Sequence, residues 1–99
     1  MRVIYDPRKR DLILARRGLD FARANLAFDG FHLTRSDPAH SDMEERFITV
    51  GLLDGSVVII VWTERDGTRR VITMWKANER ERELYFRQRE RSEGNEAGT

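Results

Sequence analysis

Three β-rich runs separated by two Asp-Gly pairs constrain the fold of this chain more than any other feature. The pairs lie at 54–55 and 66–67, and the runs cover residues 46–53, 56–65 and 68–75. Asp-Gly between apolar runs is a strong signal for a tight β-hairpin turn. We therefore predict a three-stranded antiparallel meander. Its middle strand is apolar on both faces, so helices should cover one face and another element or a partner protein the other.

The segment before the meander is predicted to contribute two strands and two helices. Asp6 followed by Pro7 is typical of the cap and first residue of a helix, and Gly18 is typical of a helix end. Asp20 is a second potential cap. The predicted elements are a strand at 2–5, a helix at 7–17, a helix at 21–28 and an edge strand at 31–35.

The segment after the meander is predicted to form one charged helix over residues 79–91, because Asn78 and Glu81 have the pattern of a capping box. Residues 92–99 lack large apolar side chains and are predicted to be a disordered tail. The expected fold class is α+β, with a small antiparallel sheet made of the meander, the N-terminal strand and the edge strand. Two N-terminal helices and one C-terminal helix would pack on this sheet in a single domain over residues 1–91.

Composition argues against several classes of protein. The 99 residues include no cysteine, so a disulfide framework and a cysteine metal site are impossible. No run approaches the ~18 apolar residues of a membrane span, and no signal-peptide pattern is present, so we expect a cytoplasmic protein without membrane contact. His32 and His40 fit no paired-histidine motif, and the chain has no nucleophile elbow or phosphate loop. We therefore expect neither a metal nor a cofactor.

Charge is unevenly distributed along the chain. Residues 1–29 and 63–91 each carry a net charge of +3, whereas residues 30–62 carry −3. All but two of the 18 cationic side chains are arginine, whose planar fork binds phosphate in a bidentate way. The arginines that lie at strand ends and turns can converge on an anion.

These residues are compatible with metal-free cleavage of RNA, in which the 2′-hydroxyl of the substrate is the nucleophile. Such a site needs a proton acceptor, a proton donor and cations around the transition state. The candidate catalytic residues are Arg46, Glu64, Arg65, Arg70 and Lys76, and the candidate RNA-binding residues are Arg69, Trp75 and Arg80. Trp75 offers a stacking face for a base. Taken alone, each arginine fits a solvated strand edge better than a site, and Trp62 fits the core better than a stacking surface.

The order and spacing of several short motifs resemble the BrnT family of bacterial type II toxins over residues 3–86. The motifs that carry the resemblance are Tyr5-Asp6-Pro7, Lys9, Arg16-Arg17-Gly18-Leu19-Asp20-Phe21, Ala24, Phe28-Asp29, His40-Ser41, Glu44-Glu45-Arg46-Phe47, Val50-Gly51, Thr63-Glu64-Arg65, Arg70-Val71-Ile72-Thr73-Met74, Ala77, Arg80-Glu81-Arg82 and Tyr85. The resemblance implies a RelE-like fold and a toxin that blocks translation by cutting RNA. It also implies a ribbon-helix-helix antitoxin in a hetero-oligomer, with DNA contacted only through that antitoxin.

The chain departs from the family pattern at three places, and one of them is Ile13, where the family often has Asn. The family often has Lys-His-Gly where this chain has Arg16-Arg17-Gly18, and it usually has Arg where this chain has Trp75. These departures leave a second reading open, in which the chain is a weak or inactive member that acts as a protein-binding module for the antitoxin. A stand-alone DNA-binding domain is a third reading, but no helix-turn-helix pattern supports it.

Overall fold

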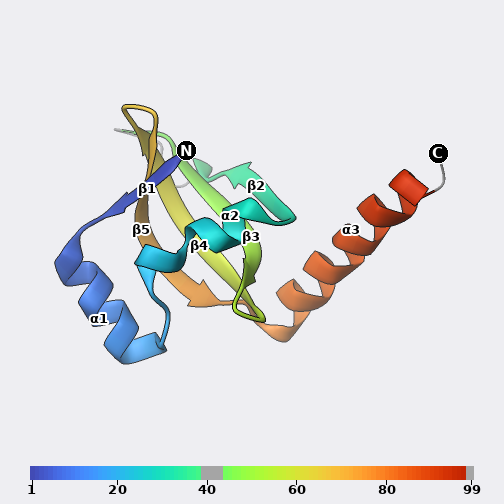
Figure 1. Cartoon of the computed structure of the whole chain (residues 1–99), viewed down its shortest axis with the longest axis horizontal. Coiled ribbons are helices and arrows are strands. Elements are labelled where there is room, and N and C mark those ends of the chain that lie inside the picture. Colours follow the sequence, from blue (N-terminus) through green and yellow to red (C-terminus); the bar gives the residue numbers. More distant parts are fainter. Residues whose placement is uncertain (39–43, 98–99) are drawn as a thin grey trace.

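The computed structural model describes residues 1–38 and 44–97, and it shows an α+β fold built on one five-stranded sheet (Figure 1). The strands are β1 (Arg2–Tyr5), β2 (His32–Ser36), β3 (Arg46–Leu53), β4 (Ser56–Arg65) and β5 (Thr68–Lys76). Their order across the sheet is β1-β5-β4-β3-β2. β1 runs parallel to β5, whereas all other pairs are antiparallel. The sheet is therefore mixed, and the prediction of a purely antiparallel sheet is wrong.

The predicted meander is confirmed, and its two turns have the backbone that Asp-Gly favours. Asp54 and Asp66 have φ angles of 47° and 49°, and Gly55 and Gly67 have φ angles of 84° and 77°. Positive φ at both central residues is the requirement of a two-residue turn that matches the twist of its strands. The central strand β4 lies between β3 and β5, as its apolar sequence predicts.

The helices are α1 (Pro7–Arg17), the 3₁₀ turn η1 (Phe21–Arg23), α2 (Asn25–Asp29) and α3 (Glu79–Ala97). The single helix predicted over residues 21–28 is thus wrong. In a 3₁₀ turn, side chains three residues apart lie above one another. This geometry buries both Phe21 and Ala24, each 0% exposed.

The C-terminal helix α3 is longer than predicted. It begins at Glu79, where Asn78 and Glu81 form the expected capping box with two reciprocal hydrogen bonds of 2.8 Å. It ends at Ala97 rather than at Arg91, so part of the predicted disordered tail is helical. The added residues 92–97 include two Glu and one Ala, which favour a helix, but also Ser, Gly and Asn, which do not.

The main core lies on the face of the sheet that carries Val58, Ile60 and Trp62, called here the inner face. α1, η1 and α2 cover this face and contribute Ile13, Phe21 and Phe28. Trp62 donates its indole N–H to Thr49 Oγ1 at 2.8 Å, and Thr49 Oγ1 lies 2.7 Å from Thr34 Oγ1. The buried indole and hydroxyl groups are thereby hydrogen-bonded, as burial requires.

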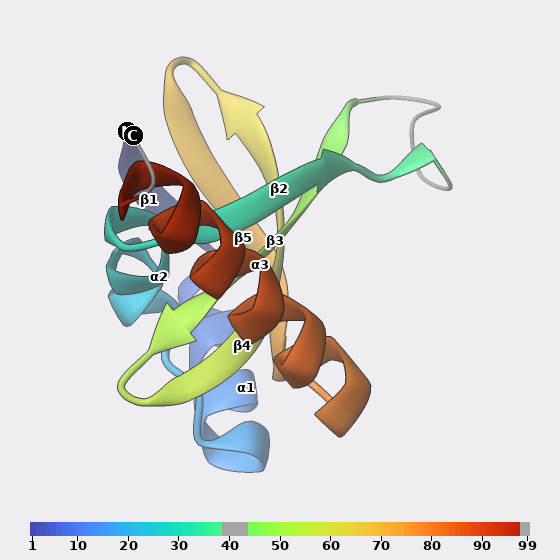
Figure 2. The ribbon, with the colours of Figure 1, turned by 90° about the vertical axis from the view of Figure 1, so that its right-hand side faces the viewer.

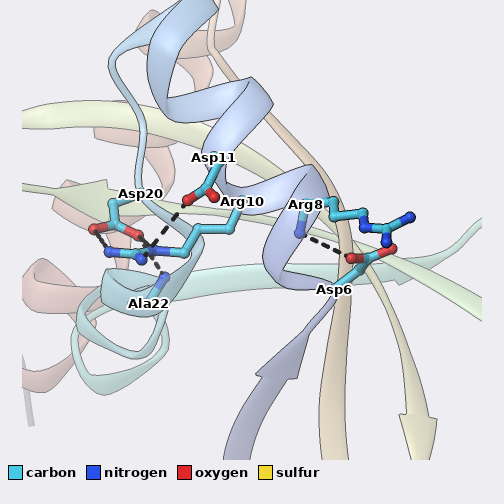
Figure 3. Close-up of polar contacts among 6 residues, drawn as sticks. All are labelled: Asp6, Arg8, Arg10, Asp11, Asp20 and Ala22. Carbon is cyan, nitrogen blue, oxygen red and sulfur yellow. Dashed lines mark hydrogen bonds and ion pairs between the residues drawn. The ribbon is translucent and has the colours of Figure 1, made fainter.

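A bidentate ion pair ties α1 to η1 on this side of the molecule (Figure 3). Arg10 Nε and Nη2 donate to the two oxygens of Asp20 at 2.7 and 2.9 Å. Asp20 also caps η1 by accepting from the Ala22 amide at 2.9 Å. Asp6 caps α1 in the same way through the Arg8 amide. These contacts fix the helices against the inner face.

The opposite face of the sheet, called here the outer face, carries Val57, Ile59 and Val61 of β4. Among the described helices, α3 alone crosses this face, on the side away from α1 and α2 (Figure 2). Tyr85 attaches the helix to the body, because its hydroxyl donates to Phe31 O at 2.8 Å and its side chain is 2% exposed. The predicted second cover of β4 is therefore supplied in part by the chain itself.

Candidate functional site

Arg46, Thr63 and Arg70 lie side by side on three neighbouring strands of the outer face. Arg46 of β3 pairs with Thr63 of β4, and Thr63 pairs with Arg70 of β5. Their sequence neighbours Phe47, Trp62 and Val71 belong to the core of the inner face, so alternation directs these three side chains outward. Strands are ~4.8 Å apart, which places the two arginine Cα atoms about 10 Å from each other.

Both arginines are available to an external anion. Within residues 1–38 and 44–97, the Arg46 and Arg70 side chains make no hydrogen bond or ion pair. Both residues are half-buried, but neither has a buried, unpaired nitrogen. A guanidinium with free donors binds phosphate oxygens in a bidentate way. Arg46 and Arg70 therefore place two such groups on either side of Thr63.

Arg65 joins this group from the end of β4, two residues beyond Thr63 on the same face. It forms an ion pair with Glu44, in which Arg65 Nη2 lies 3.2 Å from Glu44 Oε2. Arg46, Arg65 and Arg70 are called here the arginine cluster. Glu44 is therefore the carboxylate of this cluster, and the sequence-based candidates missed it. Its position directly before Glu45-Arg46 in a family-like motif was the signal that could have found it.

Glu64 and Arg69 occupy the inner face, although they adjoin Arg65 and Arg70 in sequence. They pair with each other across β4 and β5. The Arg69 guanidinium lies 4.0 Å from the ring centroid of Phe28 and 5.2 Å from that of Trp62, and its Nε atom is buried without a partner in the described residues. Arg69 therefore packs on core aromatic rings, and Glu64 points away from the arginine cluster.

A β-bulge decides which face the end of β5 presents. Val61 pairs with Thr73 and Trp62 pairs with Val71, so Ile72 is the extra residue. Trp75 consequently pairs with Ile59 on the outer face, and Lys76 pairs with Val58 on the inner face. Without the bulge, strict alternation would exchange these two orientations. Lys76 is also about 20 Å along β5 from Arg70, so the structure does not bring it to the arginine cluster.

The two remaining candidates lie toward α3. Trp75 is half-buried, facing Leu84 and Tyr85 across a shared pocket, and Arg80 is exposed in the first turn of the helix. The predicted site thus divides into three groups: the arginine cluster, the inner-face pair Glu64 and Arg69, and a distant end with Lys76 and Arg80. Trp75 shares the face of the cluster but not its position.

Three further arginines, Arg10, Arg17 and Arg23, form ion pairs or hydrogen bonds that stabilise the fold. Hydrogen bonding to Arg10 lowers the pKa of Asp20, and hydrogen bonding to Arg23 lowers the pKa of Asp54. Arg17 Nη1 donates to Met74 O at 2.8 Å. β1 pairs with residues 68–71 of β5, so Met74 O lies on a part of the β5 edge that β1 does not cover. The Arg17 side chain supplies a donor for this carbonyl. Arg17, in the place of the family histidine, therefore supports β5.

The described residues contain neither a cluster of metal ligands nor a helix that could span a membrane. Outside segments 39–43 and 98–99, no group of three or more His, Cys, Asp or Glu residues is arranged to hold a metal ion. No helix within that same part of the chain is long and apolar enough to cross a membrane. His40 and Ser41, which contribute to the family resemblance, lie outside the described residues.

The described part of the chain is a small α+β domain that carries unpaired arginines on one face of its sheet. Its family follows from sequence: the family model described as "Ribonuclease toxin, BrnT, of type II toxin-antitoxin system" matches residues 5–81. The chain belongs to this family, which implies an antitoxin as its partner. Among curated proteins, none matches the chain.

Proposed function

We propose that this protein is a metal-independent endoribonuclease toxin that inhibits translation by cutting RNA on its outer face. The observation that carries the proposal is the register of Arg46, Thr63 and Arg70, which places two arginines with unpaired side chains on either side of Thr63. Cations placed where charge develops stabilise a transition state strongly, and losing one such donor typically costs about 10²–10³-fold in rate. The RelE-type fold and a single toxin domain over residues 1–91 are parts of this proposal.

The reaction requires no group that the protein lacks. The 2′-oxygen of the RNA attacks the adjacent phosphorus, the bond from phosphorus to the 5′-oxygen breaks, and the products are a 2′,3′-cyclic phosphate and a free 5′-hydroxyl. The 2′-hydroxyl proton passes to a carboxylate, and the leaving 5′-oxygen takes a proton from solvent. Arg46 and Arg70 bind the phosphate oxygens as their negative charge increases.

Glu44 is the best-placed proton acceptor. It lies 3.2 Å from Arg65, whereas Glu64 points to the inner face. Arg65 orients the Glu44 carboxylate through two nitrogens, Nε and Nη2. A positioned base contributes typically 10²–10⁴-fold. Lys76 and Arg80 are too far along the fold to act on the same phosphate, so we propose that they contribute only to the general attraction of RNA.

The antitoxin is proposed to be a ribbon-helix-helix protein that forms a hetero-oligomer with the toxin in the cytoplasm. An acidic antitoxin segment would match the arginine cluster and would exclude RNA from it. Opposite charge across such an interface speeds association in a salt-dependent way. The toxin would contact DNA only indirectly, through its antitoxin.

Cleavage of an end-labelled single-stranded RNA by the purified chain tests the proposal. We expect cleavage in the presence of EDTA, with products that end in a 2′,3′-cyclic phosphate. Arg46→Gln and Arg70→Gln should each lower the rate by about 10²-fold or more. Arg16→Gln is the matched control, because it removes one exposed charge from α1 and should leave the rate unchanged.

Two results would contradict the proposal. Cleavage that EDTA abolishes and Mg²⁺ restores would show a metal-dependent enzyme. Equal rates for Arg16→Gln and Arg70→Gln would show that the arginine cluster is only a solvated strand edge. Toxicity in cells should follow the same order as the cleavage rates.

A non-catalytic role is the second candidate, in which the outer face serves only to bind the antitoxin. The observation in its favour is that two predicted site residues, Arg69 and Arg65, already have partners inside the molecule. Under this alternative, purified toxin would bind antitoxin tightly, and no RNA cleavage above that of the Arg70→Gln variant would occur. The cleavage assay therefore separates the two functions.

A further inference from the structure

A second feature of the outer face is a pocket of about 270 Å³ between α3 and the sheet. Its apolar wall includes Ile59 and Leu84, its aromatic wall consists of Trp75 and Tyr85, and Arg35 and Glu81 contribute charge. Trp75 faces this pocket because the bulge at Ile72 turns the end of β5 toward the outer face. Ligand pockets typically combine such an apolar lining with a few polar groups.

The pocket adjoins the arginine cluster on the same face. Ile48 lines the pocket and lies two residues along β3 from Arg46, which is about 7 Å. Arg35 of β2 pairs directly with Ile48. A polymer whose phosphate sits on Arg46 and Arg70 would therefore present its neighbouring group to this pocket.

The polar groups of the pocket are only partly used by the protein. Glu81 Oε1 accepts the Asn78 amide at 2.8 Å, and Glu81 Oε2 has no hydrogen bond in the described part of the chain. Arg35 makes one long contact of 3.5 Å to Ser36 O. One group can accept and the other can donate along the edge of a planar ligand. An apolar side chain would leave both charges without partners, which is costly on burial.

We infer that this pocket binds a nucleobase of single-stranded RNA, next to the phosphate held by the arginine cluster. The inference rests on the proposed function, because it assumes that RNA lies on the outer face. Single-stranded bases are commonly stacked on aromatic side chains and hydrogen-bonded along their edges. Trp75 supplies the stacking surface, and Arg35 and Glu81 read the edge. Trp75, which stands where the family usually has arginine, would thus contribute to base selection.

The test follows the two tryptophan indole N–H signals of the full chain by NMR. Trp75→Leu identifies the Trp75 signal, because Trp62 is then the remaining tryptophan. The probes are the four nucleoside 5′-monophosphates, with ribose 5-phosphate as the probe that has a phosphate but no base. We expect at least one nucleotide to shift the Trp75 signal in a saturable way and ribose 5-phosphate to leave it unchanged. Trp75→Leu should weaken nucleotide binding, measured by calorimetry, by about ten-fold or more.

Leu84→Asn and Leu26→Asn provide matched variants. Leu84 lines the pocket and is 51% exposed, whereas Leu26 lies on α2 and is 39% exposed. Leu84→Asn should weaken nucleotide binding, and Leu26→Asn should not. A Trp75 signal that no nucleotide moves, or equal affinities for both variants, would overturn the inference. So would a Trp75 signal that responds only to the antitoxin, since the occupant would then be a protein side chain.

The outcome separates this inference from the proposed function. RNA cleavage without a nucleotide-dependent shift of the Trp75 signal would reject the base-binding pocket but support the ribonuclease activity. A saturable Trp75 shift in a protein that does not cleave RNA would retain the pocket and reject the ribonuclease.

Discussion

The two faces of the sheet are similar in sequence but different in structure. Both faces of β4 are apolar, and Val58 and Ile60 on the inner face are 0% exposed. Three helical segments pack on the inner face, whereas α3 is the only helix on the outer face within residues 1–38 and 44–97. Apolarity alone therefore did not determine which face became the core. The difference came from the connections, because every element between β1 and β2 lies on the inner side.

The arginines on the two sides of the sheet differ in whether they have partners within the protein. Near the inner face, Arg10 and Arg23 are held by aspartates, and Arg69 lies on aromatic rings. On the outer face, Arg46 and Arg70 have no side-chain partner in the described residues. An arginine that already has a partner contributes to the fold, and one without a partner is free to bind an anion. The number of arginines is thus less informative than their partners.

Gly51→Ala should produce the largest effect on stability, because it acts where α2 touches β3. A Cβ atom at Gly51 would lie 2.8 Å from Ala27 O and 2.9 Å from Ala27 Cβ. Relieving this clash requires α2 to move off the sheet, which should lower the free energy of unfolding by about 2–3 kcal/mol. Urea denaturation measures this change.

Gly30→Ala is the control for that prediction. A Cβ atom at Gly30 meets nothing within 4 Å, and the φ angle of −94° suits any residue. This variant should unfold within about 0.5 kcal/mol of the original protein. Equal losses in the two variants would mean that α2 does not press on the inner face as described.

Tyr85→Phe should have a smaller effect, because it removes the hydroxyl that donates to Phe31 O and leaves the buried ring in place. We expect the free energy of unfolding to fall by about 1 kcal/mol. Burial also raises the pKa of the Tyr85 phenol above its ordinary value of 10.0. Since the folded state favours the protonated phenol, its contribution is complete below that value and is lost as pH rises through the folded-state pKa.

Ultraviolet titration of tyrosinate in a Tyr5→Phe background measures the Tyr85 pKa. Only one tyrosine then titrates, since the chain has two. Normal ionisation of Tyr85 would show that α3 does not bury it against the outer face.

Lys76→Gln and Arg80→Gln should have the smallest effects on RNA cleavage. Lys76 lies about 20 Å from Arg70, beyond the ~8 Å screening length of physiological salt. We expect each substitution to change the rate by less than about two-fold at that ionic strength. A large loss in either variant would place the reacting phosphate at the other end of the sheet and would reject the arginine cluster.

The strands and turns could be predicted because their signals are local. Each Asp-Gly pair specifies a turn through the positive φ of its own two residues, and Asp6, Gly18 and Asn78 end or begin helices through contacts within a few residues. The short parallel strand β1 was located by sequence, but its direction against β5 depends on the path of α1 and α2. Local sequence patterns do not specify the path of these two helices.

The arrangement of the candidate site residues was harder to predict than the fold, because a single bulge residue decides which face of the sheet each side chain at the end of β5 points to. Strict alternation places Arg70 and Lys76 on one face, and the bulge at Ile72 separates them. The stack of Arg69 on Phe28 joins residues far apart in sequence, so no spacing rule could reveal it. Arg46, Arg65 and Arg70 flank the same end of the meander, and the strand register places them on one face of the sheet. Their role in catalysis stays a prediction.

A paired measurement on Arg69→Gln and Arg70→Gln tests the central claim that the two faces have separate roles. These adjacent residues point to opposite faces, and each substitution removes one charge while keeping most of the side chain. Arg69→Gln should lower the free energy of unfolding by about 1–2 kcal/mol, through the lost aromatic stack, and should leave the cleavage rate of the folded protein nearly unchanged. Arg70→Gln should leave stability within about 0.5 kcal/mol and lower the cleavage rate by about 10²-fold or more. If instead Arg69→Gln abolished cleavage while Arg70→Gln only lowered stability, the assignment of the two faces would be contradicted.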